Sequence, residues 1–327
     1  MGLEYDMSEP SITPVCAFDI GDDGAVRPVT SRWPGTETTD TYRWLHFDLN
    51  DPGFAAWAQA HLPHVAAKAL LQSETRPRCE ATPAGMILNL RGVNLNPGAD
   101  AEDMVSIRVW VDDGLIVSAR RYKLFAIDAI RADINAGNPP KDIPAFLAAL
   151  AFGLTKRIET ISLGLEENAD ALEELAFDPR APRLENLPEI RQSIIKLRRF
   201  VRPQAEALKA LGAGVIWPLD EINATYLRET INRNQRTLEE LDATADRLSA
   251  IQEHQDAKAA AALGRNSYVL SIIAAIFLPL GFLTGLFGIN VGGMPLINSD
   301  IGFAVVAGGS AAIGILVLLV FRILRWL

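Results

Sequence analysis

Carboxylates recur at seven-residue intervals in the last third of the chain, at Glu239, Asp246 and Glu253, and His254 follows the third. On a helix this spacing places the three carboxylates along one face, with a drift of about 20° per heptad. Several copies of such a helix around an axis would stack rings of carboxylates, which concentrate divalent cations at the mouth of a path. A charged stripe is also typical of a helix face that is simply exposed to water.

Small residues continue the same row toward the C-terminus. They follow at intervals of seven as Ser267, Ala274, Gly281 and Gly288, with Ser271, Leu278 and Gly285 on the neighbouring row. Small residues along one stripe let helices approach closely in a membrane. They also suit the wall of an ion path, and both interpretations hold together because helices around a pore must touch. The predicted pore-lining set is Ser267, Ser271, Ala274, Leu278, Gly281 and Gly285.

The other candidate metal ligands are weaker. His61 and His64 lie three residues apart, but Pro63 separates them and no carboxylate or cysteine stands at a matching spacing, so we expect a surface or core role. Cys16 and Cys79 form no C-x-x-C pair. The cysteines therefore predict neither a disulfide framework nor a structural zinc site.

Motifs typical of enzymes are missing from the sequence. It contains no Walker A sequence, no dinucleotide-binding glycine pattern, no H-E-x-x-H and no G-x-S-x-G. His46 lies in a strand-like run and is interpreted as structural. We therefore predict a protein that is not an enzyme and has no bound cofactor.

Charge is distributed unevenly along the 327 residues, which carry a net charge of −9. No concentration of Lys and Arg suggests a nucleic-acid surface. Nearly all of the charge precedes residue 266, whereas residues 266–299 contain no Asp, Glu, Lys, Arg or His. The acidic, polar start of the sequence predicts no signal peptide. A soluble region is therefore expected to precede a short membrane anchor.

Two apolar segments near the C-terminus, 268–287 and 301–321, are each close to the roughly 20 residues that cross a bilayer as a helix. The absence of charge from both disfavours a pair of buried helices in a soluble core. Lys258 and Arg265 precede the first segment, Arg322 and Arg325 close the second, and the loop 288–300 has no Lys or Arg. Both termini are therefore predicted to be cytoplasmic, with Asp300 in the outer loop.

The elements that would position these groups are predicted from periodicity. Asp113-Gly114 between two β-rich runs predicts a hairpin. Helices are predicted at 144–175 and 187–200, with Pro203 just beyond the second, and one long helix at 219–287 would span roughly 100 Å. Extended runs are predicted at 14–20, 42–49, 86–95, 105–111 and 115–120.

A heptad-like series predicts that the long helix packs lengthwise against other helices. Its members are Ile231, Asn234, Leu238, Leu241, Ala245 and Leu248. The predicted domains are a cytoplasmic α/β domain with a helical hairpin (1–218), a long stalk helix (219–267) and a transmembrane hairpin (268–327). The fold class is an α+β cytoplasmic domain, a mixed sheet with flanking helices, plus the stalk and two C-terminal transmembrane helices.

Gly288-Ile289-Asn290 stands at the end of the first apolar segment and is followed by Val-Gly-Gly-Met-Pro. This resembles the G-M-N signature of CorA-type metal transporters, with Ile in place of Met, and is most similar to the ZntB branch, which has a similar Gly-Gly-x-Pro turn. Pro279, the basic C-terminus and the segments 73–78 and 115–120 extend the likeness over most of the chain.

The resemblance implies a CorA-like homopentamer in the bacterial inner membrane, with a ring of Asn290 at the outer mouth of its pore. Gly288 and Ile289 would shape the turn of this selectivity motif, and the metal would meet Asn290 as a hydrated ion. Zinc uptake linked to the proton gradient is the implied function. A CorA-type channel for magnesium, cobalt or nickel and a non-conducting membrane-anchored sensor or scaffold remain open.

Overall fold

The computed structural model describes residues 11–178, 184, 186–214, 219–288, 295 and 299–323. The chain forms two compact units, Met1–Ile251 and Gln252–Leu327. The first unit contains a seven-stranded sheet in the order β2-β1-β3-β7-β6-β5-β4. β3 and β7 pair in parallel, and the other neighbouring strands pair antiparallel. The strands are β1 (Cys16–Ile20), β2 (Val26–Pro28), β3 (Tyr42–Asp48), β4 (Arg78–Thr82), β5 (Gly85–Gly92), β6 (Val105–Asp112) and β7 (Leu115–Arg120).

All five predicted strands are present, and the predicted hairpin joins β6 to β7. Asp112 pairs with Leu115, and Gly114 takes the left-handed conformation with φ 72° that the turn requires. Two strands, β2 and β4, were not predicted. Both lie at the edges of the sheet and contain no fully buried residue, so neither carries the apolar alternation that marks a half-buried strand.

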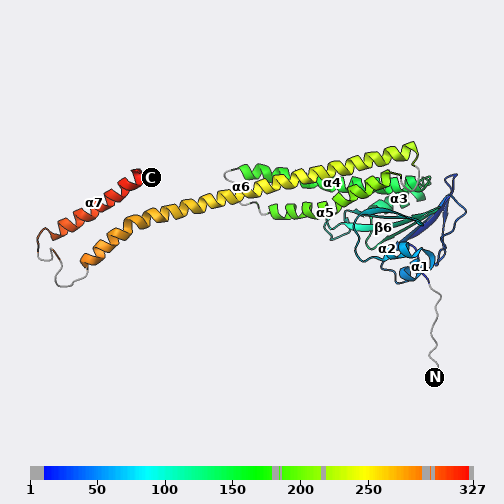
Figure 1. Cartoon of the computed structure of the whole chain (residues 1–327), viewed down its shortest axis with the longest axis horizontal. Helices are drawn as coiled ribbons and strands as arrows, with labels where there is room; N and C mark the ends of the chain where they lie inside the picture. The colour runs from blue at the N-terminus through cyan, green and yellow to red at the C-terminus, as the bar shows by residue number, and fades with distance from the viewer. Residues whose placement is uncertain are drawn as a thin grey trace, which may run out of the picture. The chain divides into compact units, whose positions relative to one another are not determined.

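Helices cover both faces of the sheet (Figure 1). Alternation along β6 sends Ile107, Val109 and Val111 to one face and Trp110 to the other. The first face packs against α3 (Phe125–Asn135) and α4 (Ile143–Phe177), together with parts of α5 (Leu187–Gly212) and α6 (Glu221–Gly288). The second face packs against α1 (Gly53–His61) and α2 (His64–Leu71).

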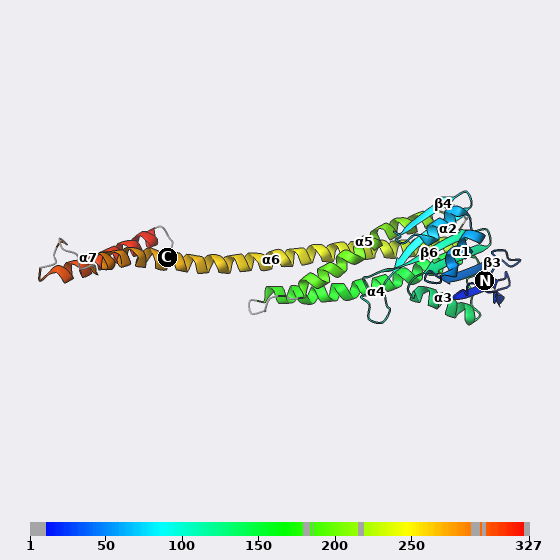
Figure 2. The same cartoon turned by 90° about the horizontal axis from the view of Figure 1, so that it is seen from below.

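Beyond the sheet, α4, α5 and the first part of α6 lie side by side and share a core (Figure 2). The predicted heptad positions supply much of the α6 face of this core. Asn234, Leu238, Leu241, Ala245 and Leu248 are buried, and Ile231 is half-buried. The prediction that the long helix packs lengthwise is therefore confirmed for its first part.

The predicted end of the second helix at residue 200 is wrong. α5 continues to Gly212, and Pro203 lies inside it. Proline removes one backbone hydrogen bond and crowds the preceding turn, which favours a helix end. In α5 the buried residues Val201, Ala205 and Leu208 continue the apolar stripe across the proline. Their packing outweighs the local cost, so the helix does not stop.

The single long helix predicted at 219–287 is confirmed as α6, which has 68 residues. Pro279 and Gly264 lie inside it. The predicted second apolar helix at 301–321 corresponds to α7 (Gly302–Ile323), whose first turn begins where Gly302 N donates to Ser299 O over 3.0 Å. The predicted boundary between stalk and membrane at residue 267 falls within continuous helix and stays a prediction.

Candidate functional site

The second unit exposes a large apolar surface. Its two helical segments are long and apolar enough to cross a membrane. The most apolar 18-residue stretch of each segment is not buried inside the chain. Leu278 on α6 is 74% exposed and Phe303 on α7 is 87% exposed. Apolar surface of this extent requires a lipid or protein environment outside the single chain.

The predicted pore-lining residues lie on α6 within this apolar segment. All six, and Gly288 at the end of the helix, are exposed. A side chain added at Gly281, Gly285 or Gly288 would meet no described atom of this chain within 4 Å. Packing within the chain therefore does not explain these glycines. Lipid, a neighbouring copy or an aqueous path remain as the surroundings that favour small residues here.

Hydroxyl groups on this part of α6 are satisfied by the helix itself. Ser271 Oγ donates to Ser267 O over 2.9 Å, and Thr284 Oγ1 lies 3.0 Å from Leu280 O. A hydroxyl bonded in this way avoids an unpaired donor in lipid and keeps lone pairs that can face water. Thr284 was not among the predicted pore residues. It lies one position before Gly285, and its polarity within an apolar run is the signal that marks it.

The selectivity motif is only partly within the described residues. Gly288 is the last residue of α6, whereas Ile289 and Asn290 lie outside the described part of the chain. Asp300 lies in an exposed turn directly before α7. The role predicted for Asn290 is therefore taken up below as a proposal.

The predicted acidic row is exposed along α6. Glu239, Asp246 and Glu253 are exposed, and His254 is half-buried. Glu239 accepts a hydrogen bond from Gln235 Nε2 over 3.0 Å, a contact within one helix face. No residue described in the first unit buries Glu239 or Asp246, so both interpretations of the row, a solvated face and a lining of charge, agree with this exposure.

A second acidic group lies between α4 and α6 and was not predicted. Burial and the nearby carboxylates Glu166 and Glu159 raise the pKa of Glu240. Arg233 Nη1 lies 3.4 Å from a Glu159 oxygen and offsets part of this charge. The sequence could not reveal the group because its members come from two helices that are far apart along the chain.

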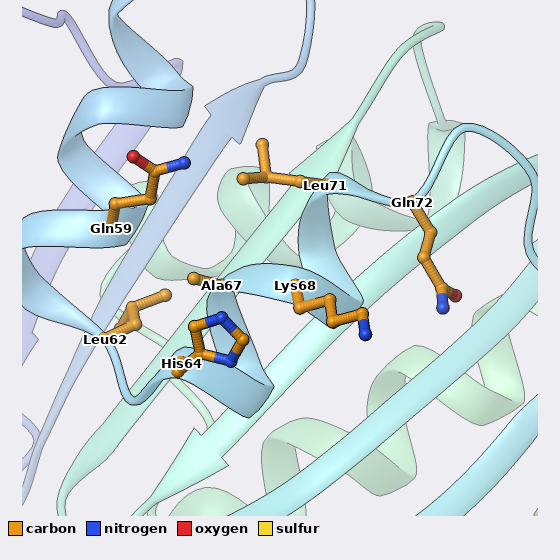
Figure 3. A pocket seen from close by; sticks show the side chains of 7 residues that line it. All are labelled: Gln59, Leu62, His64, Ala67, Lys68, Leu71 and Gln72. Atoms are coloured by element: carbon orange, nitrogen blue, oxygen red, sulfur yellow. The ribbon is translucent and has the colours of Figure 1, made fainter.

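The two histidines of the pair lie in different surroundings. His61 Nδ1 lies 3.1 Å from Trp57 O, and the His61 ring stacks on the Trp57 ring. His64 lines a pocket of about 690 Å3, where Lys68 stands on the same side of α2 (Figure 3). A lysine ammonium disfavours a metal cation at that place. Within the described residues no group of three or more His, Cys, Asp and Glu side chains is placed to hold a metal ion.

His46 is a buried core residue, in agreement with its predicted structural role. It is fully buried on β3, and its Nδ1 lies 2.8 Å from Ser118 Oγ. Desolvation by burial, with the positive charge of Arg120 as a smaller cause, lowers the pKa of His46 to about 3. The ring is therefore neutral near pH 7.

Comparison with known proteins decides the family. The family model described as "CorA-like Mg2+ transporter protein" matches residues 39–323, which include strands β3 to β7, all the helices and both apolar segments. The chain belongs to the CorA family. This CorA-family chain is 39% identical over 292 residues to the divalent cation transporter CmaX of Pseudomonas aeruginosa, covering 87% of each.

A second relative of the CorA-family chain is the zinc transport protein ZntB of Pectobacterium atrosepticum. The two are 33% identical over 292 residues, with 88% of each covered. The solved structure of full-length CmaX matches with a TM-score of 0.79 and 35% identity, covering 96% of this chain and 98% of that one. The predicted family and the predicted CorA-like fold class are both confirmed. The family is one of transporters, and nothing in the comparisons points to an enzyme.

Proposed function

We propose that this chain transports divalent metal cations across the bacterial inner membrane and that zinc is its cargo. The observation that carries the proposal is the exposed row of small residues on the apolar end of α6, in a CorA-family chain. Two relatives support the cargo class, since one is named a divalent cation transporter and another a zinc transport protein.

Two helices cannot enclose an aqueous path, so transport requires an oligomer. We propose a homopentamer in which the apolar segment of α6 from each copy surrounds the axis. The small row from Ser267 to Gly285 would line the path, and its glycines would leave room for water. α7 would lie outside, against lipid.

Selection is proposed to occur at a ring of Asn290, with Gly288 and Ile289 shaping the turn. An amide oxygen accepts hydrogen bonds from the water around a cation without fixing the metal as a thiolate or imidazole would. A hydrated zinc ion would then be chosen and still be able to leave. This weak contact favours permeation over storage.

The direction of passive flow follows from charge. An inside-negative potential of about 100 mV favours inward movement of a divalent cation by about 4.6 kcal/mol. Zinc uptake is therefore proposed, aided by the proton gradient. The spans hold no side chain that titrates near neutral pH, so a coupled proton would use pore water, Asp300 outside, or His254 and Glu253 inside.

The proposed orientation places both termini in the cytoplasm, because basic residues flank the spans on the side of the soluble unit. The alternative of a CorA-type channel for magnesium, cobalt or nickel is supported by the description of the family model, which names Mg2+. A non-conducting sensor or scaffold is the other alternative.

The test is metal uptake into liposomes that contain the purified full-length chain. Zinc, magnesium, cobalt and nickel are compared with and without an imposed proton gradient. We expect zinc uptake to exceed magnesium uptake and to rise when protons are more concentrated outside. Gly281→Leu should lower uptake by roughly tenfold or more, because it adds a bulky side chain to the path. Gly309→Leu, the matched change at an exposed α7 glycine, should leave it near wild type.

Each part of the proposal has its own contrary result. No flux of any divalent cation would exclude transport and leave the sensor interpretation. If magnesium is preferred over zinc, only the assignment of zinc as cargo is excluded. If uptake does not depend on the proton gradient, only the coupling to protons is excluded. Equal loss in Gly281→Leu and Gly309→Leu would exclude the α6 row as the lining of the path. If the largest product of chemical cross-linking in the membrane contains a number of chains other than five, the pentamer is excluded.

A further inference from the structure

The last turns of α7, the red helix in Figure 1, hold a groove that combines apolar and basic side chains. A cavity of about 540 Å3 lies there, lined by Ile315, Leu318, Leu319 and Arg322. Spacings of three and four residues place these side chains on one side of the helix. The three apolar side chains are 45–58% exposed, and Arg322 is exposed as well. The groove is therefore open to the surroundings of α7.

A different side of α7 is the one that the chain itself covers. Ser310, Gly314 and Val317 follow one another at intervals of four and three residues and are half-buried, and Phe321 continues this stripe as a buried residue. Leu319 is two residues from both Val317 and Phe321, which is about 200° around the helix from each. The groove thus faces away from the covered stripe, and the described residues leave it open.

Along the membrane normal, the groove has the same order of polar and apolar parts as a phospholipid. The 22 residues of α7 make a helix about 33 Å long, close to the thickness of the hydrocarbon core of a bilayer. Arg322 is the second-last residue of this helix and therefore reaches the water interface, whereas Ile315 lies about 10 Å deeper. A headgroup at Arg322 would let an acyl chain run over Leu318 and Leu319 toward Ile315.

The charge of Arg322 has no acidic partner. No carboxylate in the described ranges forms an ion pair with it. The negative end of the α7 dipole stabilises a cation here, but it leaves the guanidinium free to bind a phosphate through two parallel hydrogen bonds. Arg322 closes the second span on the proposed cytoplasmic side, where the leaflet carries anionic lipids. Charge complementarity therefore favours an anionic headgroup over a zwitterionic one.

We propose that the α7 groove binds one anionic phospholipid of the cytoplasmic leaflet. Its phosphate lies on Arg322, and one acyl chain lies along Ile315, Leu318 and Leu319. The inference rests on the proposed orientation of α7 in the membrane, and it goes beyond metal transport because it gives the assembly a specific lipid partner at a defined place. Each copy of the chain holds one such lipid.

The test is native mass spectrometry of the full-length assembly in dodecyl maltoside, with phosphatidylglycerol or phosphatidylcholine added. One basic side chain near an anionic headgroup contributes about fivefold in affinity. We therefore expect phosphatidylglycerol to bind about fivefold more tightly than phosphatidylcholine, with one molecule retained per chain. Inorganic phosphate in large excess should not displace it, because the acyl chain contributes to the binding.

Two pairs of variants separate the site from general attraction to lipid. Arg322→Gln should remove the preference for phosphatidylglycerol. Arg265→Gln removes the same charge from an exposed residue on the same proposed side of the membrane, and it should keep the preference. Leu319→Trp fills the groove and should weaken the binding of both lipids. Leu316→Trp changes a 60% exposed residue of α7 outside the groove, so it should bind both lipids as the wild type does.

Several results would overturn the proposal. Equal affinity for the two lipids would exclude recognition of the anionic headgroup, and displacement by inorganic phosphate would exclude a lipid as the specific ligand. Equal losses in Arg322→Gln and Arg265→Gln would reduce the effect to a general attraction of basic residues to anionic lipid. A smaller assembly in Leu319→Trp would show that a second copy of the chain covers the groove. Because binding is measured without metal, a failure of the transport proposal leaves this test intact.

Discussion

At the scale of single residues, His46 shows how burial sets a protonation state. The ring is fully buried, and its pKa is lowered to about 3 from an ordinary value of 6.5. Below pH 6.5 the unfolded chain takes up a proton at this histidine, whereas the folded chain does not until about pH 3. Above pH 6.5 the ring is neutral in both states, so this difference in proton uptake takes nothing from the free energy of unfolding near pH 7. The free energy of unfolding then falls progressively as the pH is lowered through this window.

The lowered pKa of His46 predicts that the protein loses stability in acid. Between pH 6.5 and 4.5 the difference in proton uptake at His46 should remove about 2 kcal/mol from the free energy of unfolding. His46→Asn keeps a polar partner for Ser118 and should flatten the dependence by that amount, although it lowers stability at pH 7. The measurement is urea unfolding of the full-length chain at several pH values.

The exposed His64 provides the control for this prediction. His64→Asn should keep the wild-type dependence on pH, because His64 is exposed on α2 and lies outside the buried core that surrounds His46. An acid slope in His46→Asn that matches the wild type would show that His46 does not contribute.

Sequence spacing predicted the exposed row on α6 well, because helical periodicity alone decides which residues share a stripe. It did not reveal which buried polar residues face each other across the sheet, as Asn89 of β5 and Arg108 of β6 do. This pairing depends on the register of β5 against β6, which no local pattern specifies. The same limit applied to Glu240, whose acidic neighbours lie on α4.

At the scale of elements, glycine acts in opposite ways in a turn and in a helix. Gly114 has φ 72°, a conformation that costs other residues about 1–2 kcal/mol, so Gly114→Ala should destabilise the chain by about that amount. Gly164 lies inside α4, where a side chain would meet no described atom within 4 Å. Gly164→Ala should therefore stabilise the chain by about 0.5–1 kcal/mol. Denaturant midpoints of the two variants check the pair, and shifts in the same direction would contradict it.

Elements with a buried face were predictable, and elements without one were not. β6 and α4 carry long apolar patterns, which remain recognisable even where a single residue departs from the pattern. β2 and β4 are held by a neighbouring strand through backbone hydrogen bonds, which leave little trace in side-chain types. The end of α5 was predicted wrongly at Pro203 because local propensity is a weak prior once tertiary packing continues beyond it.

At the scale of the whole molecule, the acidic row of α6 could attract cations to the proposed path only in an oligomer. If five copies surround one axis, Asp246 and Glu253 form rings that raise the local concentration of divalent cations. The double variant Asp246→Asn/Glu253→Gln should lower zinc uptake several-fold at low metal and approach wild type at saturating metal. Liposome uptake against zinc concentration is the measurement.

The control for the rings removes the same charge elsewhere. Asp133→Asn/Glu206→Gln neutralises two exposed carboxylates of the first unit that lie outside the α6 row. It should leave the zinc dependence unchanged. If both double variants behave like the wild type, Asp246 and Glu253 are only a solvated face.

The parallel pairing of β3 with β7 has a consequence for synthesis on the ribosome. β3 can pair with β1 as soon as both have been translated, but its other edge pairs with β7, as Arg43 does with Leu115, and must wait until the hairpin of β6 and β7 has been made. At roughly 5–20 residues per second the wait is several seconds, during which β3 exposes unpaired backbone. The last strand ends at Arg120, well before Tyr268 opens the first apolar segment. All seven strands are therefore synthesised before the first apolar segment, so the sheet can be completed before that segment is made.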